Sequence, residues 1–166
     1  MSRREPPAEP RLIADAMLGG LARWLRVLGI DVAHDPSLGD AALVDRAVAE
    51  RRTILTRDRK LVERKRARDH LLIASEVVDE QVRQVVDHLG LRPDPDRLHT
   101  RCLVCNEPLE PLDPDEARPH VPPHVARTQT TYRRCPVCRR IYWPATHVHR
   151  MRARLRRMGL DPTAEP

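Results

Sequence analysis

The sequence contains no phenylalanine, and two tryptophans and two tyrosines are its only aromatic residues. A folded core must therefore be built mainly from aliphatic side chains. No apolar run approaches the ~20 residues that span a bilayer, and no signal-peptide pattern opens the chain. These absences argue against a membrane partner. We expect a cytoplasmic protein, in which cysteines favour metal binding over disulfide formation.

Acidic residues are missing from one long stretch of the chain. Residues 1–96 carry 17 cationic and 17 anionic side chains, so the whole net charge of +6 lies in residues 97–166. Within residues 117–160 there are eleven arginines and no aspartate or glutamate. A segment with this charge is typical of proteins that bind a polyanion, and nucleic acid is the partner it predicts.

All four cysteines fall in two matched CxxC pairs, Cys102/Cys105 and Cys135/Cys138. Two such pairs with no cysteine left over are typical of a closed, four-thiolate zinc site, which stabilises a fold and leaves no open position for substrate. The alternatives are a redox dithiol pair and four thiols without a shared role. Two downstream histidines are potential replacement ligands: His147 and His149.

Short apolar runs alternate with amphipathic stretches over residues 11–96. This β-α-β rhythm predicts a parallel sheet flanked by helices, in which strands of four or five apolar residues are buried on both faces. Residues 1–10 read as a disordered tail and residues 97–160 as a zinc ribbon with an arginine-rich helix. Within the second region, we expect an irregular loop over Pro108–Pro123 and a helix over His147–Leu160 that ends at Gly159.

Three aspartates are expected at one edge of the predicted sheet, where ligands of open parallel sheets bind. Asp15 follows the first strand, Asp58 follows the third, and Asp40 begins the second helix. Together they could hold Mg²⁺ or Mn²⁺, which prefer oxygen ligands. Two of them also have a structural reading: Asp40 as a helix N-cap, and Asp58 as an ion-pair partner of a neighbouring arginine. Asp15 has no capping role that is evident from the sequence.

Three blocks of sequence resemble the Mut-seven C-terminal RNase domain family. They are Asp15–Asp31, Asp40–Glu50 with Ile54–Asp58, and Cys135–Trp143. The resemblance implies an α/β fold of PIN-like type: a three-layer α/β/α domain with a parallel sheet, followed by a small C-terminal zinc ribbon and basic helix. It also implies that Asp15, Asp40 and Asp58 are catalytic ligands of Mg²⁺ or Mn²⁺. The glutamate that PIN domains commonly add on a helix between the first two acids has no equivalent here, so one or two metal ions remain open.

Basic residues near these two sites are candidates for contact with RNA. Tyr132, Tyr142 and Trp143 lie among the arginines of the ribbon, as in proteins that bind single-stranded or looped RNA, although the resemblance suggests that at least one belongs to the ribbon's own core. A solvated charged surface is the alternative for every such cation. The candidates are Arg23, Arg26, Arg59, Lys60, Arg133, Arg134, Arg139, Arg140, Arg150 and Arg154.

The sequence therefore predicts a metal-dependent ribonuclease that hydrolyses phosphodiester bonds and uses its ribbon to bind the RNA backbone. The expected partner is RNA, with tRNA or the ribosome as candidates, and the oligomeric state stays open. A non-catalytic RNA- or ribosome-binding protein with a vestigial acidic site is the first alternative. A nuclease or repair accessory that acts on DNA is the second.

Overall fold

The computed structural model describes residues 9–144 and 146–162, without the side chains of Thr146 and His147. The expected disordered tail therefore lies almost wholly outside the described residues. Contacts divide the chain into two compact units: residues 1–25 with 30–89, and residues 26–29 with 90–166. The predicted domain limits, 11–96 and 97–160, differ from these units in the placement of residues 26–29 and 90–96.

The first unit contains a four-stranded sheet in which every neighbouring pair of strands is parallel. The strands are β1 (Arg11–Ala14), β2 (Asp31–His34), β3 (Thr53–Thr56) and β4 (His70–Leu72), in the order β2-β1-β3-β4. They coincide with the short apolar runs of the sequence. The predicted α/β class with a parallel sheet is therefore confirmed.

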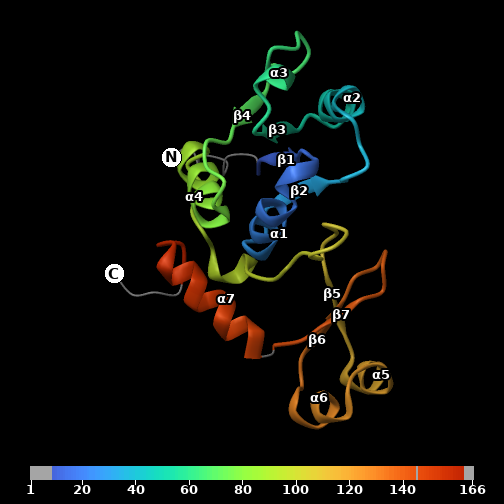
Figure 1. The fold of residues 1–166 in the computed structure, drawn as a ribbon. Helices are drawn as coiled ribbons and strands as arrows, with labels where there is room; N and C mark the ends of the chain where they lie inside the picture. Colours follow the sequence, from blue (N-terminus) through green and yellow to red (C-terminus); the bar gives the residue numbers. More distant parts are fainter. Residues whose placement is uncertain (1–8, 145, 163–166) are drawn as a thin grey trace, which may run out of the picture. The chain divides into compact units, whose positions relative to one another are not determined.

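Helices cover both faces of this sheet (Figure 1). A short 3-10 turn, η1 (Ala16–Leu18), leads into α1 (Gly19–Val27), and α2 (Asp40–Glu50), α3 (Arg59–Val62) and α4 (Val78–His88) follow the next three strands. The chain moves from β1 to β2 in one direction and from β2 to β3 in the other. Right-handed crossovers therefore place α1 on one face and α2 and α3 on the opposite face.

The aliphatic core follows from this layering. Alternate strand residues point to opposite faces, so Ile13, Ala33 and Ile54 meet α2 and α3, while Leu12, Val32 and Leu55 are buried toward the other face. On that other face, Gly20 of α1 lies against Val78 of α4. The cluster under α2 and α3 contains Ile13, Ala33, Leu43, Val44, Ala47, Ile54, Leu61 and Ala67.

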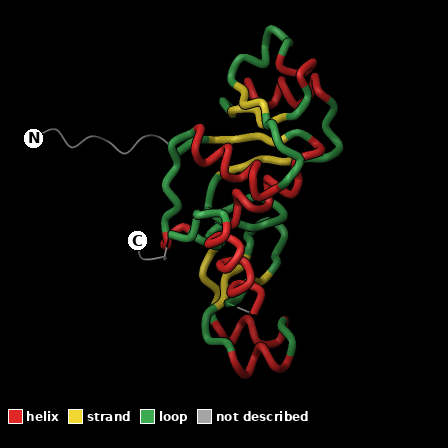
Figure 2. Tube along the Cα trace, turned by 60° about the vertical axis from the view of Figure 1, so that its left-hand side comes forward, coloured by secondary structure: helices red, strands yellow, loops and turns green. Residues whose placement is uncertain are grey.

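The second unit is built on short strands joined by long loops (Figure 2). Its sheet is antiparallel, in the order β5-β6-β7. The helix α7 follows the sheet, and no helix in the described part of the chain is long and apolar enough to cross a membrane. The elements are η2 (Pro95–Arg97), β5 (Glu110–Leu112), α5 (Pro114–Ala117), η3 (Arg118–His120), α6 (Pro123–Thr128), β6 (Tyr132–Arg134), β7 (Ile141–Tyr142) and α7 (Thr146–Arg157).

The proline-rich segment Pro108–Pro123 is not the irregular loop that we expected. It contains β5, α5 and η3, and α6 begins at its last residue. Pro114 and Pro123 begin helices instead of breaking them, because a residue at the first helical position has no partner for an N–H group. Asp113 caps α5 just before Pro114, and its carboxylate accepts a hydrogen bond from the backbone N–H of Asp115 at 2.7 Å.

The basic helix ends as predicted near Gly159, which has a φ of 70°. The Gly159 N–H donates to Arg156 O and the Leu160 N–H donates to Leu155 O, the pattern of a Schellman motif. The α1 helix ends in the same way at Gly29, with a φ of 78°. A Cβ at Gly29 would lie 2.3 Å from Arg97 O, so a side chain cannot be accommodated there.

Candidate acidic centre and cysteine cluster

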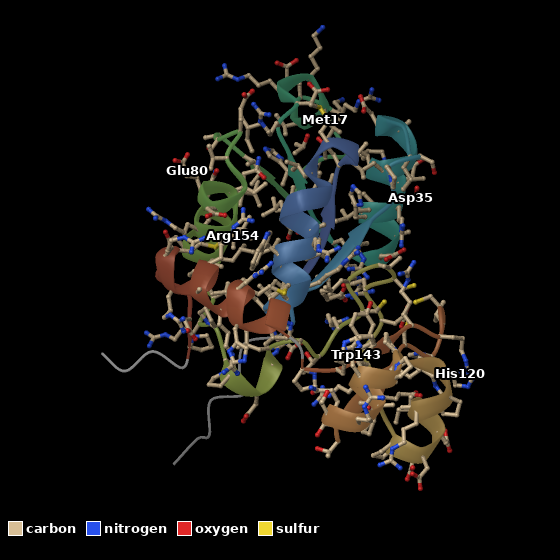
Figure 3. The ribbon with its side chains drawn as sticks, turned by 60° about the horizontal axis from the view of Figure 1, so that its bottom comes forward. Met17, Asp35, Glu80, His120, Trp143 and Arg154 are labelled. Atoms are coloured by element: carbon tan, nitrogen blue, oxygen red, sulfur yellow. The ribbon has the colours of Figure 1, made fainter. Side chains whose placement is uncertain are left out.

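The order of the strands creates a switch point in the first unit. After β1 the chain crosses to β2 on one side, and it later returns to form β3 on the other side of β1. Ligands of such sheets bind outside the carboxyl ends of the strands at this point. Asp15 follows β1 and Asp58 follows β3 two residues after the strand ends, so both acids lie at the switch point. Met17 and Asp35, labelled in Figure 3, belong to the same edge of the sheet.

Asp15 is held firmly at this edge and is 9% exposed. Its Oδ1 accepts a hydrogen bond from Met17 N at 2.8 Å, so the carboxylate caps η1. Its Oδ2 accepts a hydrogen bond from the Thr56 hydroxyl at 2.5 Å, and its own N–H donates to Leu55 O. The sequence interpretation assigned Asp15 no capping duty, and this was wrong, because the cap serves a short 3-10 turn that the helical pattern does not reveal.

Asp58 is exposed and caps α3. Its Oδ1 accepts a hydrogen bond from Lys60 N at 2.8 Å, and its N–H donates to Thr56 Oγ1 at 3.0 Å. The buried Thr56 hydroxyl therefore bonds to both acidic residues. Sequence reasoning missed Thr56, although a hydroxyl residue that ends an apolar strand two positions before an acid is a usable signal. In the described part of the chain, neither Asp15 nor Asp58 forms an ion pair.

Asp40 differs from these two acids. It is the first residue of α2, and the N-cap is Gly39, so the alternative of Asp40 as the N-cap was wrong by one position. Its carboxylate is 47% exposed and lies 3.3 Å from the guanidinium of Arg64. Over residues 9–144 and 146–162, carboxylate oxygens of Asp15, Asp40 and Asp58 do not all lie within 4.8 Å of one another.

Other polar groups surround the acidic edge. His34, at the end of β2, places its Nε2 3.3 Å from Ala16 O, next to Asp15 in sequence. The pKa of Asp35 is lowered by hydrogen bonds from the side chain and backbone of Ser37. After β3, Arg57 pairs with Glu76 at 2.6 Å, and Glu76 comes from the segment that follows β4.

The basic candidates of the chain's first ninety residues separate into two groups. Arg23 is exposed on α1, and Arg59 and Lys60 are exposed at the start of α3, directly after Asp58. Arg26 is 4% exposed, and its Nη1 donates to Leu103 O and Val104 O at 3.0 Å each. The prediction that Arg26 contacts RNA is therefore not supported by its geometry, because its guanidinium holds the backbone of the first cysteine knuckle.

In the second unit, the four cysteines converge. Their sulfur atoms all lie within 4.8 Å of one another, and the Cys102 and Cys138 sulfurs are 3.6 Å apart. A tetrahedral zinc with Zn–S bonds of about 2.3 Å places its sulfurs about 3.8 Å apart. The cluster can therefore hold a metal ion such as zinc. In the described part of the chain, this is the one group of three or more such side chains close enough to do so, and it contains no histidine.

The two knuckles share one backbone conformation. In each, the N–H of the second cysteine points at the sulfur of the first, at 3.3 Å from Cys105 N and 3.5 Å from Cys138 N. The next residue has a left-handed backbone, with a φ of 69° at Asn106 and 63° at Arg139. Such repeated N–H···S contacts orient thiolates around a metal. Each CxxC pair is therefore already shaped to present two sulfurs to one ion.

Tyr142 supports the first cysteine from outside the knuckles. Its hydroxyl lies 3.1 Å from Cys102 Sγ and accepts a hydrogen bond from Leu103 N. Burial disfavours the Cys102 thiolate, but hydrogen bonds from Cys105 N and from the Tyr142 hydroxyl outweigh it and lower the pKa of Cys102 to about 7. Burial raises the pKa of Cys105 to about 12. The sequence signal for this role was the position of Tyr142 shortly after the second knuckle.

The predicted basic residues of the ribbon are distributed over several elements. Arg133 and Arg134 are half-buried in β6, and Arg134 lies 3.9 Å from Glu116. Arg156 lies 3.2 Å from Asp161. The lack of acids within residues 117–160 suggested that these arginines have no acidic neighbours, and this was wrong, because Glu116 and Asp161 lie just outside that stretch. The remaining candidates are exposed or half-buried: Arg139, Arg140, Arg150 and Arg154.

Comparison with known proteins adds one finding. A family model described as "Mut7-C RNAse domain" matches residues 10–155, nearly the whole chain. No curated protein and no solved structure matched.

Proposed function

Because the chain belongs to the Mut7-C RNAse domain family, we propose that it is a ribonuclease whose chemistry takes place at the carboxyl edge of the parallel sheet. The observation that carries this proposal is the pair Asp15 and Asp58. Both residues lie at the switch point and bond to the buried Thr56 hydroxyl, Asp15 through its carboxylate and Asp58 through its backbone N–H, and neither carboxylate has a cationic partner among the described residues. Charged groups at functional sites are often left without a structural partner in this way.

The donor set fits a hard divalent cation. Mg²⁺ and Mn²⁺ take oxygen ligands, and Mg²⁺ is commonly bound by one or two carboxylates with water and substrate phosphate completing the shell. Asp15 and Asp58 would hold the ion in our proposal. Asp40 enters the proposal as a third acid of the same edge, reached when Arg64 releases it. Such an ion supplies neutralisation of phosphate charge and a more acidic bound water.

The residues of the chain orient this centre. Thr56 donates to Asp15 Oδ2, which directs the carboxylate, and Met17 N fixes the other oxygen. Arg59 and Lys60 are exposed next to Asp58, where they would bind the phosphates that flank the scissile bond. The resemblance to the RNase family implies products with 3′-hydroxyl and 5′-phosphate ends, for which the attacking water expels the 3′-oxygen from phosphorus.

In the same proposal, the cysteine cluster binds zinc and gives the basic segment a fixed shape, while its arginines bind the RNA backbone. Such contacts depend on the charge of the phosphates and not on the base sequence. The affinity for RNA should therefore fall steeply as the salt concentration rises. The arginines that support this role are those without a carboxylate partner among the described residues, such as Arg133, Arg139 and Arg140. A cytoplasmic location and contact with tRNA or the ribosome belong to the proposal as well.

The test is cleavage of labelled single-stranded RNA with Mn²⁺ or Mg²⁺. We compare the wild type with Asp15→Asn and Asp58→Asn, which keep the size of each side chain, and with Asp87→Asn as a matched control on exposed α4. Cleavage should fall at least ~100-fold in the first two variants and stay unchanged in the control. Equal cleavage by all four proteins would contradict the proposal.

A second function is favoured by one observation: the three aspartates do not converge in the described structure. An RNA- or ribosome-binding protein with a vestigial acidic site would retain salt-dependent RNA binding and cleave nothing with either metal. Competition between RNA and DNA of equal length addresses an action on DNA. Equal or stronger DNA binding would count against a preference for RNA.

A further inference from the structure

The second unit contains a cavity that the proposed functions of the zinc and the arginines do not use. Its volume is about 270 Å³. We call it the ribbon pocket and define it by the six residues on which the argument depends. They are Leu103, Arg133, Tyr142, Trp143, Met151 and Arg152.

Three aromatic residues line the ribbon pocket, Tyr132, Tyr142 and Trp143, and the two on which the argument depends, Tyr142 and Trp143, are held in place by contacts outside the cavity. The Tyr142 hydroxyl is engaged with Cys102 Sγ and Leu103 N, so its ring cannot turn away without breaking contacts at the cysteine cluster. Trp143, labelled in Figure 3, packs against the buried cluster around Leu112 and Tyr132. A flat ligand can therefore meet rigid aromatic faces, which lose little conformational freedom on binding.

The charge of the pocket has one sign. Arg101, Arg133, Arg152 and His99 contribute to its lining, and no aspartate or glutamate does. Arg101 is committed to the fold, because its guanidinium donates to Gly29 O and Asn106 O. Arg133 and Arg152 have no carboxylate partner among the described residues. The complementary ligand is therefore an anion with an aromatic part.

One of the arginines that line the pocket has a donor without an acceptor. The Nε of Arg152 is buried, and no atom of the described residues accepts a hydrogen bond from it. Nearly all buried polar groups in native structures are paired, and an exception calls for an explanation. A carbonyl or ring nitrogen of a bound ligand would satisfy this donor once the half-buried Arg152 side chain turns toward the cavity that it lines.

We propose that the ribbon pocket binds a single unpaired nucleobase of RNA. The base meets the rings of Tyr142 and Trp143 and accepts a hydrogen bond from Arg152, while the adjoining phosphate lies near Arg133. The cavity is slightly smaller than the ~300–1,000 Å³ that holds drug-sized ligands, which suits one base and excludes a base pair. This inference rests on the proposed function for the identity of the polymer, and it adds a preference for unpaired RNA.

The test compares two probes of equal length and charge: a short single-stranded RNA and the same ribose-phosphate chain without bases. Binding is measured by fluorescence anisotropy in an Asp15→Asn background, so that cleavage does not interfere. Stacking of one base in the pocket should make the base-bearing RNA bind about 10-fold more tightly. No difference between the two probes would overturn the proposal.

Two variants test whether the preference for the base-bearing RNA arises from the ribbon pocket. Arg152→Met removes the buried donor, and Met151→Trp fills the cavity without changing charge. If one variant fails to fold, the other still tests whether the pocket binds the base. Arg157→Met is the matched control, because it removes one exposed arginine from the same helix and does not line the cavity. Circular dichroism and zinc content verify the fold. The two pocket variants should lose the preference and the control should keep it; retention by a folded pocket variant would overturn the proposal.

Cleavage by the protein with an intact acidic edge is measured separately with Mn²⁺. Cleavage without a preference for bases would overturn the ribbon pocket and leave the nuclease proposal standing. A preference that the pocket variants lose, with no cleavage, would support the ribbon pocket and contradict the nuclease. The two proposals can therefore fail independently.

Discussion

The acidic residues at the two edges of the parallel sheet differ in whether they have a cationic partner. At the amino edge, Arg52 is only 8% exposed and donates to Asp31 at 2.7 Å, to Glu50 at 2.5 Å and to Leu12 O at 3.0 Å. At the carboxyl edge, Asp15 and Asp58 both bond to the hydroxyl of Thr56 and have no cationic partner among the described residues. The acids of the amino edge are therefore paired with arginine, whereas these two acids of the carboxyl edge are not.

This difference suggests that the amino edge stabilises the fold, whereas the carboxyl edge serves the proposed chemistry. Buried ions need partners, because an uncompensated buried charge is strongly destabilising. The amino edge meets that requirement within the fold. At the carboxyl edge, only neutral donors such as Thr56 bond to the Asp15 carboxylate. That carboxylate can therefore still attract a bound metal ion. Predictions that separate the two edges therefore test both the fold and the proposed function.

The largest expected effect is at the amino edge. Replacement of Arg52 by Met should lower the free energy of unfolding by about 3–5 kcal/mol, because Asp31 and Glu50 would lose their shared buried partner. Urea denaturation measures the change. Arg11→Met is the control, since Arg11 is half exposed and its ion pairs are long, so it should cost less than ~1 kcal/mol. Equal losses of unfolding free energy in the two variants would contradict the prediction that the buried ion pairs of Arg52 stabilise the fold more than the exposed ones of Arg11.

The second effect belongs to the carboxyl edge and depends on metal. Mn²⁺ at 100 times its dissociation constant should stabilise the wild type by about 2.7 kcal/mol, since it binds the folded state alone. Thermal unfolding with and without Mn²⁺ measures the shift. Asp15→Asn should abolish the gain, and Asp87→Asn should preserve it. A gain of the same size in Asp15→Asn would place the ion elsewhere and break the comparison.

The third effect separates the two roles of Asp58. Asp58→Ala removes the α3 cap and should cost about 1 kcal/mol, whereas Asp58→Asn keeps a capping oxygen and should cost a few tenths. Both variants lose the charge, so both should lose cleavage equally. Paired urea and cleavage measurements give the answer. If activity followed stability across the two variants, Asp58 would be a structural cap and nothing more.

The smallest effect is the pH dependence of the amino edge. Hydrogen bonds from Arg52 and Arg46 lower the pKa of Glu50 below its ordinary 4.5. A carboxyl group with a lowered pKa in the folded state contributes stability above its unfolded pKa and loses it as the pH falls through the folded pKa. The loss below pH 4.5 should not exceed ~1 kcal/mol for this partly exposed group.

Stability curves of the wild type and Arg52→Met between neutral and acidic pH test this dependence. The variant should show a shallower acid loss. The contribution of Asp35, whose lowered pKa arises from Ser37 at the other edge, should persist in both proteins. Parallel curves would mean that Arg52 does not influence the ionisation of Glu50.

The elements of the first unit were predictable because their signals are local. Buried strands of four residues and helices of period 3.6 leave a pattern within ten residues, and Gly29 and Gly159 mark helix ends by their backbone requirements alone. The convergence of four cysteines was predictable for the same reason, since each CxxC pair already defines half of the site.

The contacts of the site residues were not predictable, because they join distant positions. Thr56 reaches Asp15 across 41 residues, and Arg26 reaches Leu103 across 77. A charged residue in an amphipathic helix gives no sign of which backbone carbonyl it will meet. The error over Pro108–Pro123 was different and avoidable, because the pair Asp113-Pro114 already matches the start of a capped helix.

The placement of Arg26–Gly29 in the second unit has a consequence for dissecting the protein. A fragment that begins at residue 90 would retain every cysteine but would lose the donors to Leu103 O and Val104 O, and with them the acceptor Gly29 O for Arg97 and Arg101. The unit that contains the cysteine cluster is thus discontinuous in sequence. A single truncation therefore cannot separate it intact. A fragment without residues 26–29 would leave the carbonyls of Leu103 and Val104 without the donors that Arg26 provides.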